Sequence, residues 1–182
     1  SKPPGQLSTR NFVLLGDPAL RMAYPKNIVR TVSITNQLNN QVTDTLRALD
    51  LLKINGEITS LNNTLISDFN GFVEITVFDK KTKYKTRGND SYSYPVEFYC
   101  QDKIIWQGKV SASQGKFECS FVVPKDIAYN YGSGKISYYA WSNETDEAGY
   151  SSEFIIGVMN PDAPVDMTGP VISLYLNDTT FL

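Results

Sequence analysis

The stretch from Lys103 to Pro124 constrains the fold most, because it carries both signals of a β-hairpin. In its second arm, every other residue is apolar: Phe117, Cys119, Phe121 and Val123. Successive side chains of a strand leave opposite faces, so this pattern predicts a half-buried antiparallel strand. Gln114-Gly115 supplies the turn, since glycine adopts positive φ without steric cost. We expect Trp106 and Phe121 to anchor a core beneath the hairpin.

Strand-like segments recur along most of the chain, at residues 29–35, 46–59, 72–78, 96–100, 135–142 and 150–158. With the hairpin arms they give about eight strands at intervals of roughly 8–12 residues, which favours an all-β, immunoglobulin-like antiparallel β-sandwich. Leu49–Ile54 has helical propensity, but Asn55-Gly56 interrupts it, and Gly56 predicts a bulge or bend. We expect a helical turn or a Tyr-rich corner at 125–134, and a loop at 143–149 that joins the last two strands.

The composition fits a single folded domain and argues against binding of nucleic acid. The 182-residue chain is 41% hydrophobic, with 11 Tyr and 9 Phe, residue types that suit pleated sheets. Its formal net charge is −2, which argues against nucleic-acid capture, and no apolar run is long enough to insert in a membrane. The basic cluster Lys80–Arg87 is interpreted as a solvated edge strand, with a binding patch as the alternative.

The chain contains no histidine, which removes catalytic triads, Cys–His dyads and the common zinc sites. Its two cysteines, Cys100 and Cys119, both fall on the apolar parity of their strands. Two buried free thiols are the favoured interpretation, and a disulfide is the alternative.

The two ends of the chain resemble pieces of neighbouring modules. Phe12–Leu15 reads as a buried strand without a partner, followed by the breaker Gly16-Asp17-Pro18. Asp17 and Arg21 are interpreted as a turn cap and a local ion pair, rather than a catalytic pair. We therefore expect residues 1–27 to be the end of a preceding domain or a docking segment, residues 28–159 to be the sandwich, and residues 160–182 to be a linker and the first strand of a following module.

Three runs together resemble the gingipain-type cysteine peptidases (peptidase family C25), and among them the sortases of the bacterial type IX secretion system. These runs are Asn11–Pro25, Gly115–Ile127 continuing into Gly134–Ala140, and Thr168–Asp178. The first run is similar to the end of the caspase-like catalytic domain. The second is similar to the β-sandwich that follows that domain, and the third to the start of the next module. The resemblance implies an exported protein of the cell surface, at the outer membrane or in the periplasm.

The resemblance also implies what this chain lacks. Members of the family use a Cys nucleophile activated by His, and no motif carrying either residue matches a position here. We therefore predict no catalytic, cofactor-binding or metal-ligating residue in this chain, and assign proteolysis to the parent protein. The expected partner is its own upstream catalytic domain, which the sandwich would pack on and support. The alternative is a recognition module for secreted protein substrates or surface glycans.

Two clusters are weighed as binding sites. Asn143, Glu144, Asp146 and Glu147 offer oxygen ligands for Ca²⁺, but their spacing fits no EF-hand, and an acidic surface loop is favoured. An aromatic cluster suits stacking on sugar rings, although core or cross-strand pairs are favoured; its members are Tyr129, Tyr131, Tyr138, Tyr139, Trp141 and Tyr150. Tyr131 and Tyr150 side by side over a groove would favour glycan binding.

Overall fold

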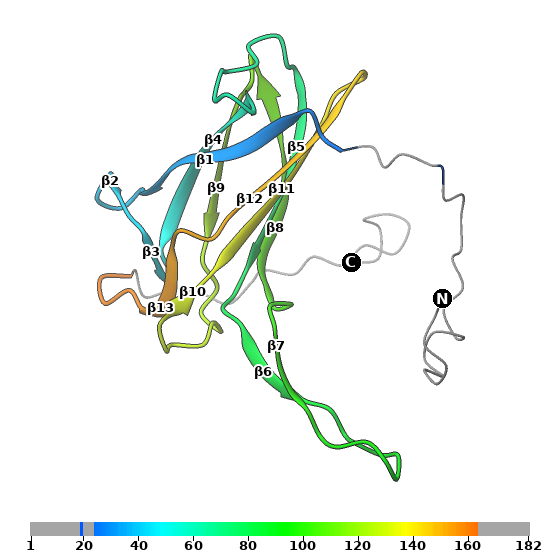
Figure 1. The fold of residues 1–182 in the computed structure, drawn as a ribbon. Coiled ribbons are helices and arrows are strands. Elements are labelled where there is room, and N and C mark those ends of the chain that lie inside the picture. Colours follow the sequence, from blue (N-terminus) through cyan, green and yellow to red (C-terminus); the bar gives the residue numbers. More distant parts are fainter. Residues whose placement is uncertain (1–18, 20–23, 164–182) are drawn as a thin grey trace, which may run out of the picture.

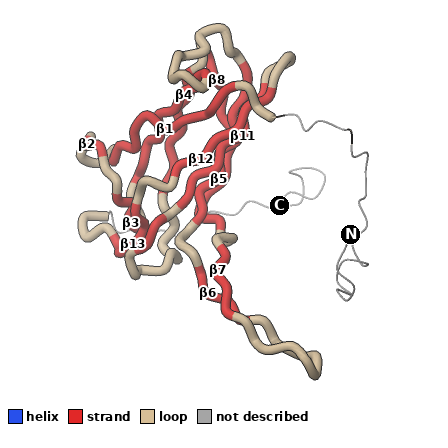
Figure 2. The backbone as a smooth tube through the Cα atoms, viewed as in Figure 1, coloured by secondary structure: helices blue, strands red, loops and turns tan. Residues whose placement is uncertain are grey.

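The computed structural model describes Ala19 and residues 24–163, and every regular element in those residues is a β-strand (Figure 2). The all-β class predicted from the sequence is therefore confirmed. No helix among these residues is long and apolar enough to cross a membrane. The Asp17–Arg21 pair, nearly all of the expected docking segment and the expected strand at 171–182 fall outside the described residues.

Thirteen strands are present in the described part of the chain (Figure 1). They are β1 (Asn27–Asn36), β2 (Gln41–Val42), β3 (Thr45–Ala48), β4 (Leu51–Ser60), β5 (Gly71–Phe78), β6 (Thr82–Lys85), β7 (Glu97–Cys100), β8 (Ile104–Ser113), β9 (Lys116–Val122), β10 (Gly132–Ser133), β11 (Lys135–Trp141), β12 (Asp146–Ser151) and β13 (Ile155–Met159).

Seven strands form a barrel-like ring in the order β12-β11-β5-β8-β9-β4-β1, and β2 pairs with the end of β1. The ring closes through a parallel pair, Ile28 with Ala148. At the opposite corner, β8 and β9 pair only beside their turn, at Ala112–Phe117 and Ser113–Lys116. Two halves thus face each other and remain hydrogen-bonded at both corners, so the predicted immunoglobulin-like sandwich is not confirmed.

The interior of the barrel is filled by the alternating faces that the sequence predicts. Val73, Ile75 and Val77 of β5 are fully buried, and Trp106 stacks on Phe121 at 4.8 Å between ring centroids. The Phe117 ring packs edge-on against Tyr138 at 5.6 Å. These contacts confirm the hairpin as an anchor of the core.

Gly56 has a different role from the predicted one. Strand β4 is continuous through Gly56, and the bulge lies on its hydrogen-bonded neighbour β1, between Thr31 and Ser33. A Cβ at Gly56 would overlap the ring of Phe117. Glycine is therefore needed because an aromatic side chain covers the backbone at this point.

The closing strand pair differs from the prediction. Strand β11 pairs with β12, which begins at Asp146, whereas residues 155–159 form β13 and pair with β3 and β10. The sequence pattern hid β12 because its inward residue, opposite Ala140, is the charged Glu147. Residues 125–134 form no helix; turns lead to the short strand β10.

Strands β6 and β7 pair only with each other among the described strands and form a ribbon that projects away from the barrel (Figure 1). All four residues of β6 are exposed, as predicted for the basic cluster. Lys80 is the exception, because it is buried where the ribbon leaves the barrel. Cys119 lies in the core and Cys100 is only partly buried on the ribbon; both are free thiols.

Candidate ligand-binding groove

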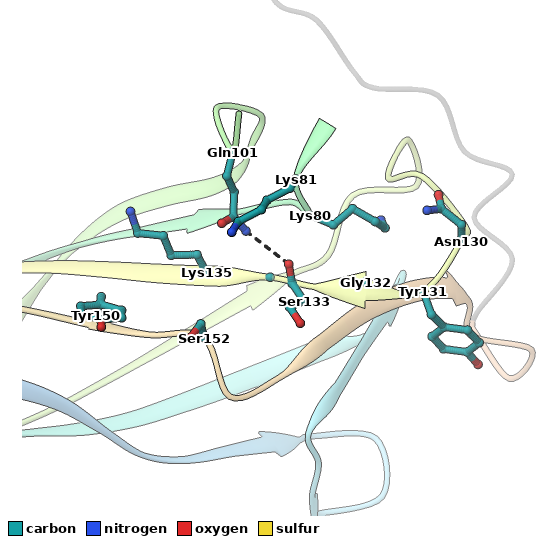
Figure 3. A pocket seen from close by; sticks show the side chains of 11 residues that line it. Lys80, Lys81, Gln101, Asn130, Tyr131, Gly132, Ser133, Lys135, Tyr150 and Ser152 are labelled. Carbon is teal, nitrogen blue, oxygen red and sulfur yellow. Dashed lines mark hydrogen bonds between the residues drawn. The ribbon is translucent and has the colours of Figure 1, made fainter. Parts of the chain in front are cut away.

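A groove of about 730 Å³ lies at the base of the β6–β7 ribbon, where the ribbon meets β10, β11 and the end of β12 (Figure 3). Its lining includes two lysines, an amide, a hydroxyl and two tyrosines: Lys81, Lys135, Gln101, Ser133, Tyr131 and Tyr150. These residues come from four separate segments of the chain. The groove therefore exists only because the barrel and the ribbon are joined here.

The floor of the groove is held by a buried ion pair. The Lys80 ammonium donates hydrogen bonds to Asp79 Oδ1 at 2.8 Å and to the carbonyl of Ala128 at 2.7 Å. Lys103 Nζ lies 3.8 Å from the other oxygen of Asp79. Burial alone would raise the pKa of Asp79, but the hydrogen bonds and the charge of Lys80 outweigh it and lower that pKa. Lys80 is thus already neutralised and serves the fold.

Gln101 fixes the ribbon against β10. Its Nε2 donates to the carbonyl of Asp79 at 2.7 Å and to the carbonyl of Ser133 at 3.3 Å (Figure 3). Both amide hydrogens are therefore used inside the protein. The side chain therefore connects the ribbon to β10, and its carbonyl oxygen remains available to accept a hydrogen bond.

Lys81 and Lys135 give the groove its charge. Within residues 24–163, neither ammonium lies within ion-pair distance of a carboxylate. Lys135 Nζ is 5.3 Å from the centroid of the Phe78 ring, a cation–π contact that restrains it without neutralising it. None of the described lining residues is Asp or Glu. The groove therefore offers positive charge alone.

Tyr131 and Tyr150 are 62% and 72% exposed and line the same groove. They lie at opposite ends of it rather than side by side (Figure 3). The arrangement expected for sugar stacking between two neighbouring rings is therefore absent from this groove.

The other predicted aromatic residues separate into core and surface. Tyr138 is buried, and its hydroxyl lies 2.6 Å from Thr31 Oγ1. Tyr139 and Trp141 stack at 5.6 Å on the outside of β11, and Trp141 also meets Phe72 of β5 at 5.9 Å. Phe72, Tyr139 and Trp141 form what we call the outer aromatic face.

A lysine completes the outer aromatic face. Lys109 Nζ lies 4.0 Å from the Phe72 centroid and 4.8 Å from that of Trp141. Sequence reasoning named Tyr139 and Trp141 but missed Phe72 and Lys109, because only the β5–β8 and β5–β11 registers bring them together.

The acidic loop does not converge on one point. Glu147 is buried, and its two oxygens accept hydrogen bonds from the backbone and side-chain nitrogens of Asn27, at 2.8 and 2.7 Å. Asp146 instead accepts from the Tyr139 hydroxyl at 3.3 Å. No group of three or more His, Cys, Asp or Glu residues in the described segments is placed to hold a metal ion. Within this loop, Glu147 therefore serves as a structural carboxylate.

Cys119 is not a reactive thiolate. Burial raises the pKa of the Cys119 thiol to about 11, so the thiol is protonated at neutral pH and is a poor nucleophile. Since the sequence contains no histidine, no imidazole base is available for either cysteine.

Comparison with solved structures gives an informative match. Neither a family model nor a curated protein matches the chain. Among solved structures, dimeric latent PorU from Porphyromonas gingivalis matches with a TM-score of 0.67 and 29% sequence identity, over 92% of this chain. The chain is similar to one part of PorU. It covers 16% of the PorU chain.

The alignment with a β-glucosidase from Listeria innocua in complex with gluconolactone is weak, with a TM-score of 0.28 and 16% identity over 75% of this chain and 16% of that chain. The similarity to PorU supports the gingipain-type and type IX secretion resemblance at the level of the family.

Proposed function

We propose that this chain is the non-catalytic β-region of an exported C25-type cysteine peptidase of the type IX secretion sortase kind, acting at the cell surface, the outer membrane or in the periplasm. The similarity to PorU carries the proposal, because it spans 92% of this chain but only 16% of PorU. The absence of histidine agrees with a region that contributes no catalytic dyad. In this proposal, the two facing halves of the barrel are an immunoglobulin-like sandwich linked at its corners.

The proposed role is to pack on the catalytic domain and support it. The outer aromatic face is a suitable contact surface, since its rings are large, partly exposed and held by cross-strand contacts. Aromatic side chains are enriched at protein interfaces, and clustered exposed ones mark contact sites. In this proposal, residues 1–27 are the end of the catalytic domain or a segment that docks on it.

The test compares the parent peptidase carrying Phe72→Ala and Trp141→Ala with the unmodified enzyme. We expect a lower unfolding temperature of the catalytic domain and reduced activity, because the packing surface is lost. Tyr92→Ala with Tyr94→Ala is the matched control, because both residues are exposed aromatics in the loop between β6 and β7, away from this face. A double variant with unchanged unfolding temperature and unchanged activity would contradict the supporting role.

The second candidate function is recognition of secreted protein substrates or surface glycans, and the cationic groove is the observation that favours it. A region that only packs on the catalytic domain and supports it does not need a groove with unpaired charges. Retention of secreted proteins or surface polysaccharide on the immobilised chain tests this function. Retention of neither class would count against it.

A further inference from the structure

We propose that the groove at the base of the ribbon binds an extended peptide segment rich in aspartate and glutamate. This proposal rests on the recognition function above and names the ligand chemistry of that site.

The charges of the groove carry the first step. Lys81 and Lys135 have no carboxylate within ion-pair distance in the described chain, and Lys80 is already paired with Asp79. The whole chain has a formal net charge of −2, so the groove is positive against the overall balance. Two ammonium groups without an acid in the same concave site attract an anionic ligand.

The groove is also held in shape before a ligand arrives. Gln101 ties the ribbon to β10 through the carbonyl of Ser133, and Lys135 rests against the ring of Phe78. The Lys80 side chain packs closely on Gly132, where an added Cβ would lie 2.9 Å from Lys80 Cδ. A site that is already ordered loses little entropy on binding.

The shape of the groove favours a peptide over a saccharide. Tyr131 and Tyr150 stand at opposite ends, so they present no joint platform for a sugar ring (Figure 3). The groove is also lined by Gln101, whose carbonyl oxygen is left to accept, by the amide of Asn130 and by the hydroxyls of Ser133 and Ser152. These groups can hydrogen-bond the N–H and C=O groups of an extended backbone, while the two lysines meet its carboxylates.

Fluorescence anisotropy of a labelled oligo-Glu peptide with the 182-residue chain tests the proposal. We expect saturable binding that weakens as NaCl rises from about 50 to 300 mM, because screening reduces charge attraction. An oligo-Gln peptide of equal length should bind at least about ten-fold more weakly.

The decisive variant is Lys81→Glu with Lys135→Glu, which should weaken oligo-Glu binding about ten-fold or more and favour oligo-Lys instead. Lys26→Glu with Lys116→Glu is the matched control, because both residues are exposed, neither lines the groove and the charge change is the same. If the reversed groove variant fails to fold, Lys81→Gln and Lys135→Gln, tested singly, should each give part of the loss.

Three outcomes would overturn the proposal: equal weakening by the control pair, equal binding of oligo-Gln, or binding of polygalacturonate without binding of oligo-Glu. The last outcome would assign the groove to an anionic saccharide. The chain carrying Phe72→Ala and Trp141→Ala should bind oligo-Glu normally. Failure of the supporting role and failure of the groove are therefore separable.

Discussion

The barrel and the ribbon are built from similar strand sequences but differ in what covers them. In β5 and β9, alternate side chains point into a closed ring, and Val73 and Phe117 are buried. In β6 and β7, Tyr84 and Phe98 also share a face and stack at 5.8 Å, yet they are 40% and 46% exposed. The difference shows that alternation predicts a strand face, whereas burial depends on a second layer.

The two regions meet at the groove, which is held by polar rather than apolar contacts. Asp79, Lys80, Lys103 and Gln101 form the junction. The barrel should therefore carry most of the free energy of unfolding, the junction should make it depend on pH, and the ribbon should contribute least. Each statement can be tested separately.

The largest effect is expected in the barrel. Phe117→Ala should lower the free energy of unfolding by about 3–5 kcal/mol, because it removes a buried ring that packs on Tyr138 and Gly56. Urea unfolding followed by tryptophan fluorescence measures it. A loss below about 1 kcal/mol would mean that the ring does not fill the core.

The next effect is expected at the junction. Asp79→Ala leaves the buried Lys80 ammonium without its carboxylate and should destabilise the chain by about 3 kcal/mol. Asp79→Ala with Lys80→Met should recover part of that loss, since the unpaired charge is gone. A double variant less stable than Asp79→Ala would contradict this explanation.

The same pair should make stability depend on acid. The pKa of Asp79 is lower in the folded chain than in the unfolded one, so the stabilisation is present above the unfolded value and is lost as pH falls through the folded value. Unfolding free energy measured from neutral to acidic pH should fall less steeply in Asp79→Asn than in the natural sequence. Parallel curves would show that Asp79 does not contribute.

A smaller effect is expected from one hydrogen bond inside the barrel. Tyr138→Phe removes the hydroxyl that lies 2.6 Å from Thr31 Oγ1 and keeps the ring. The loss should be about 1 kcal/mol, measured by thermal unfolding. Tyr150→Phe, with an exposed hydroxyl, is the control and should change nothing measurable.

The smallest effect is expected in the ribbon. Tyr84→Ala and Phe98→Ala together remove one exposed cross-strand pair and should cost no more than about 1 kcal/mol. Hydrogen exchange should quicken in β6 and β7 and stay unchanged in β5. Loss of protection throughout the barrel would show that the two regions unfold as one unit.

The sequence by itself determined the local features. Alternation defined the buried faces of β5 and β9, and Gln114-Gly115 defined the hairpin turn, where both residues adopt positive φ, at 51° and 74°. These features depend on neighbouring residues alone, since side-chain period and turn geometry are properties of short segments. For the same reason, Tyr131 and Tyr150 were identifiable as candidate site residues, although their separation was not.

Only the tertiary structure decided the features that join distant residues. Strand β12 was hidden because Glu147 points inward, and its carboxylate is satisfied by Asn27, 120 positions away. Lys80 was predicted to be solvated, but it is buried because Asp79 and the carbonyl of Ala128 accept its hydrogen bonds. The ring closure at Ile28–Ala148 and the convergence of Lys81 and Lys135 on one groove also join residues that are distant in sequence. A buried charge or a binding site is stable only where separate segments supply complementary groups, and no short stretch of sequence contains that information.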